Sequence, residues 1–128
     1  MDIHAYWAAT LAQRPEEMRA FFCADAWIDW PNTNERFTVA EFVRANCEYP
    51  GLWTGRVERV EPIPGGLVAA VRVAARDGSS SFHVVSFARL REEKIAALTE
   101  YWGDDGPPPA WRCALRLGQA IPETGAAE

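Results

Sequence analysis

The chain has 128 residues, of which 48% are hydrophobic and 24% are charged, and its net charge is −5. This length suits one domain, and the composition is too apolar for a disordered chain. The acidic balance and the absence of a Lys/Arg cluster exclude a nucleic-acid-binding surface, and no apolar run approaches the roughly 20 residues that span a membrane. We expect one domain over residues 1–121 and a disordered tail over residues 122–128.

Helical spacing marks the start of the chain. Apolar residues at Ile3, Trp7 and Leu11 predict a helix over residues 3–13. Arg14-Pro15 ends it, and Pro15 with the two acids that follow begins a second helix, since Pro and acids suit a first turn.

A strand and a third helix follow. Residues 24–30 are rich in aromatic and β-branched types, which predicts a strand that stops at Pro31 and the turn-prone residues 32–34. Thr38-Val39-Ala40-Glu41 is a capping box, so a third helix is expected over residues 39–48.

The second half of the chain alternates between strand and turn signals. Short loops that contain Pro, Gly, Asp or Ser separate four expected strands, at residues 53–62, 66–76, 80–90 and 94–102. Such loops predict an antiparallel meander, and the whole order predicts an α+β fold with helices on one face of a curved sheet.

The last segment differs from the rest. Asp104 to Pro109 cannot form a regular element, because three of its residues are prolines. Residues 110–117 predict a short helix, which we expect to lie back on the body through Trp111 and Leu115. Residues 125–128 are expected to be frayed.

Metal and nucleophile patterns are missing from the sequence. The three cysteines show no metal-ligand spacing, and their odd number predicts free, mostly buried thiols in a cytoplasmic protein. No Ser-His-Asp set, phosphate loop or metal cluster stands out, so we expect neither a metal nor a cofactor.

Glu100 in the stretch ALTEYW is the acid of most interest. Strand alternation puts Leu98, Glu100 and Trp102 on one face of the last strand. If that face points inward, desolvation raises the pKa of Glu100 and makes it a candidate acid or base. If the other face points inward, Glu100 is a surface or dimer-interface charge.

The turn before this strand decides which residue accompanies Glu100. A two-residue turn at Glu92-Glu93 pairs Arg91 with Lys94 and places His83 across from Trp102, as a proton-transfer partner for Glu100. A three-residue turn shifts the register by one and puts Ser86 inside instead. Glu-Glu suits the two-residue turn poorly, since both residues would need positive φ.

This order of elements, with Glu100-Tyr101-Trp102 closing the last strand, resembles the superfamily of nuclear transport factor 2, ketosteroid isomerase, scytalone dehydratase and the SnoaL-like polyketide cyclases. The resemblance covers about Ile3 to Trp102. It implies a cystatin-like cone, in which three helices pack on a strongly curved antiparallel sheet around an apolar pocket. It also implies a homodimer formed through the sheet.

The resemblance assigns roles residue by residue. In ketosteroid isomerases a Tyr of the first helix donates to the substrate oxygen, and Tyr6 has a matching place. Their catalytic Asp precedes a Pro, but Trp30 occupies that position and cannot take a proton from carbon, so steroid-type isomerisation is not expected. A Tyr-Trp pair whose Trp lines the pocket matches Tyr101 and Trp102. Hydrolases and cyclases often carry an acid near Glu100, but the hydrolases' Asp–Arg–Asp network has no counterpart.

Three functional hypotheses are compatible with these residues. The first is a cofactor-free SnoaL-like enzyme for acid–base chemistry on an apolar or aromatic small molecule, with Glu100 as proton carrier, His83 as its partner and Tyr6 as donor. In this hypothesis the binding residues are Trp30, Trp102, Trp53 and Asn46, with Ser86 in the alternative register. The second is a non-catalytic ligand-binding protein. The third is an accessory subunit that associates through an exposed sheet face, such as one bearing Val85 and Phe87.

Overall fold

The structure, a computed structural model, describes residues 1–122. Its helices and strands follow one another as α1 (Ile3–Leu11), α2 (Pro15–Arg19), β1 (Phe22–Trp30), β2 (Glu35–Thr38), α3 (Val39–Cys47), β3 (Trp53–Ile63), β4 (Gly66–Ala75), β5 (Ser81–Arg91), β6 (Lys94–Asp104) and α4 (Ala110–Ala114). The six strands form one open sheet in the order β2-β1-β6-β5-β4-β3. The α+β class and the helix-covered, curved sheet are as predicted.

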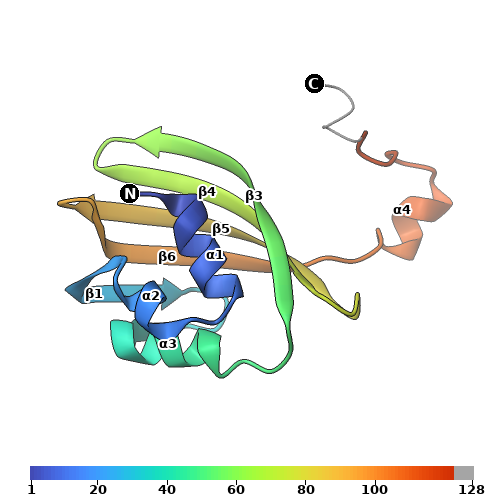
Figure 1. Cartoon of the computed structure of the whole chain (residues 1–128). Helices are drawn as coiled ribbons and strands as arrows, with labels where there is room; N and C mark the ends of the chain where they lie inside the picture. Colours follow the sequence, from blue (N-terminus) through green and yellow to red (C-terminus); the bar gives the residue numbers. More distant parts are fainter. Residues whose placement is uncertain (123–128) are drawn as a thin grey trace.

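The first three helices cover one face of the sheet (Figure 1), where α1 contacts β3 and α3 contacts β1. Large side chains from the helices and from the inner face of the strands make one continuous core, whose members include Ile3, Tyr6, Trp7, Met18, Phe22, Ile28, Phe42, Val43, Val71, Val84, Ile95 and Leu98. Apolar residues at helical spacing and at alternate strand positions therefore meet in a single layer.

Local sequence signals were reliable guides to the elements. The Thr38 hydroxyl accepts from the Glu41 backbone N–H at 3.2 Å, and the Glu41 carboxylate accepts from the Thr38 N–H at 2.9 Å, so the predicted capping box is confirmed. The four predicted strands of the second half begin and end within two residues of their expected limits.

The sheet is mixed rather than wholly antiparallel, because β1 runs parallel to β6. A strand that the sequence did not predict, β2, pairs with β1 and extends the sheet at that edge. β2 has only four residues and three of them are exposed, so it carries no apolar alternation that could distinguish it from the preceding turn.

The hairpin between β5 and β6 combines the two-residue turn, one of the two turns considered from the sequence, with an unpredicted bulge. Glu92 and Glu93 both have positive φ, 51° and 67°, and Arg91 pairs with Lys94, as the two-residue turn requires. Between Leu90↔Ile95 and Arg89↔Ala97 the register shifts by one, which leaves Ala96 as an extra residue on β6. Every pairing beyond the bulge therefore moves by one residue.

Residues 106–122, which we call the arm, extend away from the body of the molecule (Figure 1). The prediction that this segment lies back on the body is wrong, since Trp111 and Leu115 are 60% and 63% exposed. Cys113 in the arm is also exposed, whereas Cys23 and Cys47 are half-buried, and all three are free thiols. The expected fraying of residues 125–128 lies outside the described residues.

Candidate functional site

Aromatic side chains from five elements and the loop after α3 line a half-open cavity of about 290 Å³. Its apolar wall includes Trp7, Trp30, Tyr49, Trp53, Phe82 and Trp102. These rings brace one another: Trp30 meets Trp102 edge-to-face with ring centroids 6.1 Å apart, and Phe82 meets Trp102 in the same way at 6.1 Å. Edge-to-face pairs of this kind stabilise the arrangement of the wall by about 0.5–1.5 kcal/mol each, beyond the area that they bury.

The ends of α1 and α3 are joined beside this cavity. Gln13, which follows α1 with a φ of 56°, donates its side-chain amide to the carbonyls of Asn46 and Tyr49 at 2.9 and 2.8 Å. These two bonds tie the end of α1 to the end of α3, where the Asn46 carbonyl also accepts from the Tyr49 N–H at 3.4 Å. Asn46 and Tyr49 are thereby held where their side chains line the cavity.

Glu100 is buried, with 1% of its surface exposed. The indole N–H of Trp30 donates to one carboxyl oxygen at 3.1 Å, and the Ser86 hydroxyl donates to the other at 2.8 Å. Desolvation raises the pKa of Glu100 from 4.5 to about 7, although the two hydrogen bonds oppose the rise. The carboxyl group therefore changes its charge near neutral pH.

Glu100 does not line the cavity, and neither does Ser86; Trp30 connects the two regions, because its ring forms part of the wall while its N–H binds Glu100. The sequence prediction that Glu100 faces inward is confirmed. A ligand in the cavity meets Glu100 only through Trp30.

Three buried polar groups of the site have no hydrogen-bond partner within residues 1–122: the Tyr6 hydroxyl and the indole N–H groups of Trp7 and Trp102. Trp7 and Trp102 line the cavity, whereas Tyr6 lies behind it, wholly buried against Trp7. Burial, and after it the charge of Glu100, raises the pKa of Tyr6 well above its usual value. Tyr6 is therefore a neutral donor at physiological pH.

The chain's fold has many counterparts among solved structures. A candidate ketosteroid isomerase from Kribbella flavida superposes with a TM-score of 0.76 and 25% identity over 94% of this chain and 87% of that one. A nuclear transport factor 2-like protein of unknown function from Burkholderia xenovorans superposes with a TM-score of 0.72 and 21% identity, over 93% of this chain and 91% of that one. The chain has the nuclear transport factor 2-like fold.

Another solved structure matches less of the chain. An LEH-like epoxide hydrolase from M. tuberculosis has a TM-score of 0.66 and 12% identity, over 79% of each chain. Residues 1–104 are about 81% of this chain, so the Kribbella and Burkholderia structures also match part of the arm. No family model and no curated protein sequence matches the chain.

His83 is not part of the site. It pairs with Gly103 rather than Trp102 and lies on the outer face of the sheet, with 49% of its side chain exposed. Its ring contacts Asp105 through Nδ1 and approaches Glu58 to 3.4 Å through Nε2. The predicted pairing of His83 with Trp102 is wrong, because the extra residue Ala96 shifts the register.

The other predicted binding residues divide between the cavity and the buried layer behind it. Trp30, Trp102, Trp53 and Asn46 line the cavity, whereas Ser86 lies opposite Glu100 and binds it. Ser86 is inside as the three-residue turn would have placed it, but the bulge rather than the turn is the cause.

Several lining residues were not predicted. The spacing of Trp7 on its helix is typical of a core residue. Phe82 lies on β5, and its pairing with β6 could not be predicted because the bulge shifts the register. Asn32 accepts from the Trp102 backbone N–H at 2.9 Å and ties the loop after β1 to the end of β6. The high Trp content of the sequence was the one available signal for an aromatic wall.

Within residues 1–122 no group of three or more His, Cys, Asp or Glu side chains is placed to hold a metal ion. Over the same residues, every helix is too short or too polar to cross a membrane.

Proposed function

We propose that this protein binds a compact, uncharged, apolar molecule that carries a hydrogen-bond acceptor, and that it does so in the aromatic cavity. The observation that supports this most is that the Trp7 and Trp102 side chains line the cavity, while their indole N–H groups are buried and have no partner among residues 1–122. A buried donor left without an acceptor costs about 1–3 kcal/mol, and a carbonyl, ether or hydroxyl oxygen of a ligand that reaches either N–H would recover that cost.

Size restricts the ligand further. Ligand pockets commonly measure roughly 300–1,000 Å³, and the cavity of about 290 Å³ lies at the low end of that range. At the packing density of protein interiors, about 0.74, it holds roughly 215 Å³ of ligand. One- or two-ring compounds suit this space, and flat rings suit its aromatic wall.

Glu100 gives the proposed site a dependence on pH. Trp30 belongs both to the cavity wall and to the hydrogen bond with Glu100, so loss of the Glu100 proton near pH 7 strengthens a bond that orients the ring. In this proposal Glu100 is a positioning residue. Ligand affinity should therefore follow a titration with an apparent pKa of about 7.

Matched pairs of small aromatic compounds test the proposal. Calorimetric titration should show that 2-acetylnaphthalene binds roughly 10-fold more tightly than 2-isopropylnaphthalene, since only the ketone accepts a hydrogen bond. Trp7→Phe and Trp102→Phe should each reduce that preference. Trp111→Phe, in the exposed arm, is the matched control and should leave it unchanged. Absence of binding by a panel of such one- and two-ring pairs would refute the proposal.

Acid–base catalysis is the second candidate function, and the pKa of Glu100 near 7 favours it. Glu100 would take a proton from a carbon next to a ligand carbonyl, and the neutral Tyr6 hydroxyl would donate to the oxygen of the resulting enolate. Both side chains lie behind the cavity wall, so Trp30, in front of Glu100, and Trp7, against Tyr6, would have to move aside. Deuterium exchange into the methyl group of 2-acetylnaphthalene, followed by NMR in D₂O, should then be fast with the wild-type protein and slow with Glu100→Gln. Equal exchange rates for the two proteins would contradict catalysis by Glu100, and ligand binding would then be the better-supported function.

The outer face of the sheet supports the third candidate function, association with a second copy. Trp27, Phe87 and Tyr101 are 44%, 45% and 49% exposed on this face, and the Phe87 and Tyr101 rings are in contact. We propose a homodimer through this face. Phe87→Ser with Tyr101→Ser should weaken self-association in sedimentation experiments without changing ligand affinity.

A further inference from the structure

The arm beyond its prolines is apolar, and its two charged residues are both arginines, while the body of the chain is acidic. Trp111, Leu115, Leu117 and Ile121 are 60%, 63%, 56% and 87% exposed. Residues 110–122 contain Arg112 and Arg116 and no acid, and the sequence that follows them adds two glutamates, whereas residues 1–109 contain 11 basic and 16 acidic residues, which gives −5. Four large apolar side chains and two positive charges thus project from an acidic molecule.

The arm does not rest on its own body. Pro107–Pro109 keep the linker extended, since each proline fixes φ, and they direct α4 away from the sheet (Figure 1). α4 itself has five residues and no buried side chain. A helix this short is marginal in water without tertiary contacts. The arm therefore needs a surface that its own chain does not present to it.

Residues beyond the body have counterparts in other molecules. The Kribbella and Burkholderia structures align with 94% and 93% of the chain, so the alignment reaches into the arm. An arm held away from the body in this way can reach a neighbouring copy.

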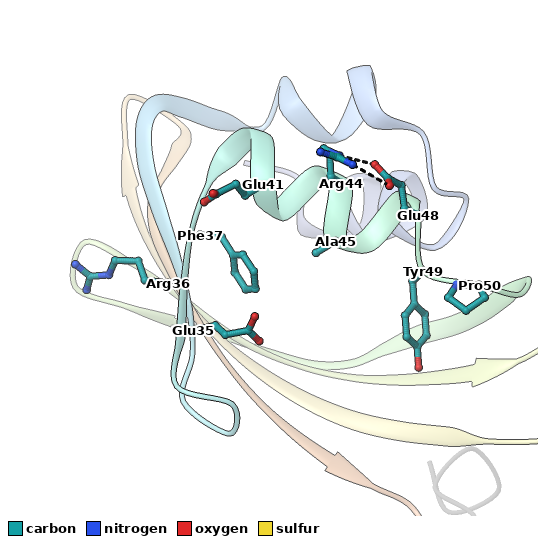
Figure 2. Close-up of a pocket in the computed structure, with 9 residues that line it drawn as sticks. All are labelled: Glu35, Arg36, Phe37, Glu41, Arg44, Ala45, Glu48, Tyr49 and Pro50. Carbon is teal, nitrogen blue, oxygen red and sulfur yellow. Dashed lines mark hydrogen bonds and ion pairs between the residues drawn. The ribbon is translucent and has the colours of Figure 1, made fainter.

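A suitable surface lies between β2 and the end of α3. Figure 2 shows this groove, in which Phe37 and Tyr49 make the apolar part and Glu35 points toward the centre. Its further lining residues include Glu41, Arg44, Ala45, Glu48 and Pro50. The groove thus offers aromatic surface together with three carboxylates.

The charges of the groove are unevenly satisfied. The cations Arg36 and Arg44 are already paired, with Asp29 and Glu48. Glu35 accepts from the Thr33 hydroxyl, and Glu41 accepts from the Thr38 N–H. Neither Glu35 nor Glu41 forms an ion pair with an Arg or Lys among residues 1–122. The groove therefore has negative charge available for a basic partner.

We infer that the arm of one copy docks in the groove of a second copy. Trp111 and Leu115 are one helical turn apart and can cover Phe37 and Tyr49 together. Arg112 and Arg116 supply the positive charge that the groove carboxylates lack. Because every copy has both surfaces, two reciprocal contacts close a two-fold dimer. This contact is separate from the proposed one through the outer face of the sheet.

Docking in this place bears on the cavity as well. Ala45 and Tyr49 line both the groove and the cavity, so the arm of the partner would lie at the edge of the binding site. Dimerisation would thereby change access to the cavity.

Charge reversal on the two surfaces tests the inference. Variant A carries Arg112→Glu and Arg116→Glu; variant B carries Glu35→Lys, which leaves the capping-box residue Glu41 and the Arg44–Glu48 ion pair intact. By sedimentation equilibrium, each variant alone should self-associate roughly 10-fold more weakly than wild type, since charges that attract at both reciprocal contacts become repulsive. An equimolar mixture of A and B should associate as strongly as wild type, because both contacts are again between opposite charges.

The control carries Arg14→Glu and Arg19→Glu, the same charge change as variant A on the exposed side chains of Arg14 and Arg19 at the two ends of α2. It should associate as wild type does, and circular dichroism should show that all variants remain folded. Unchanged association of variant A or B, a mixture that fails to recover, or a monomeric wild-type protein would each overturn the inference. A ligand-binding result in either direction leaves it unaffected.

Discussion

β5 and β6 build two polar clusters of opposite character, one on each face of the sheet. On the inner face Glu100 meets Trp30 and Ser86, away from water. On the outer face Asp105, next to the end of β6, meets Ser81 and His83. Each cluster has one carboxylate, one serine hydroxyl and one ring nitrogen.

Their electrostatics nevertheless diverge. Burial dominates at Glu100 and raises its pKa to about 7. At Asp105 burial is partial and acts in the same direction, but the hydrogen bonds from Ser81 and His83 and the charge of Arg72 outweigh it and lower the pKa. Similar side chains thus give a titrating group inside and a permanent anion outside, and the cause is access to water.

The largest expected effect is the pH dependence that Glu100 imposes on stability. Its pKa is about 7 in the folded protein, against an ordinary glutamate value of 4.5 when the chain is unfolded, so between these pH values the folded state keeps a proton that the unfolded state has lost. The free energy of unfolding should therefore fall by roughly 3 kcal/mol as the pH rises from 4.5 to 7. Urea unfolding at several pH values should show this fall for the wild-type protein and not for Glu100→Gln. Glu92→Gln, a change at an exposed glutamate, should show the same fall as the wild-type protein.

Trp30→Phe should have the next largest effect. It removes the 3.1 Å indole bond that lowers the pKa of Glu100, so that pKa should rise further and the protein should lose about 1–2 kcal/mol. NMR titration of the ¹³C-labelled carboxyl group measures the pKa. Trp27→Phe, a change on the outer face, should leave the carboxyl titration as it is; an identical shift in both variants would contradict the assigned contact.

Ser86→Ala should cost about 1 kcal/mol and raise the pKa of Glu100, because the 2.8 Å bond from the hydroxyl is lost. Ser81→Ala is its counterpart on the outer face, where water replaces the hydroxyl that binds Asp105. Chemical denaturation should therefore show a smaller loss for Ser81→Ala. Equal losses would mean that burial does not separate the two clusters.

His83→Gln should have the smallest effect. The exposed ion pairs of His83 are expected to contribute less than about 1 kcal/mol. Ligand affinity and the titration of Glu100 should remain at their wild-type values. A change in either would mean that His83 contributes to the site.

Much of the fold could be predicted because its signals are local. The capping box at Thr38 fixes the start of α3 through adjacent residues, and the positive φ values at Glu92 and Glu93 were recognised as the requirement of a two-residue turn. Simple alternation puts Glu100 on the same face as Leu98, although it does not say which face points inward. Each of these inferences uses residues close together in the chain.

The site was harder to predict because its decisive features are not local. Ala96 is the bulged residue, yet neighbouring Ala97 has the same side chain, so nothing in the sequence marks the irregularity. The bond from Trp30 to Glu100 joins residues 70 positions apart. The position of the arm was predicted wrongly because its apolar residues indicate burial but do not identify the surface that buries them.

The bulge at Ala96 also affects how this chain can be compared with others. A relative whose strand lacks the extra residue needs a one-residue gap at this point before its interior positions correspond to Leu98, Glu100 and Trp102. Without the gap, its inward residues would be compared with Ala97, Thr99 and Tyr101. A single-residue deletion here, rather than any substitution, is the genetic change that would exchange the interior row for the exterior one.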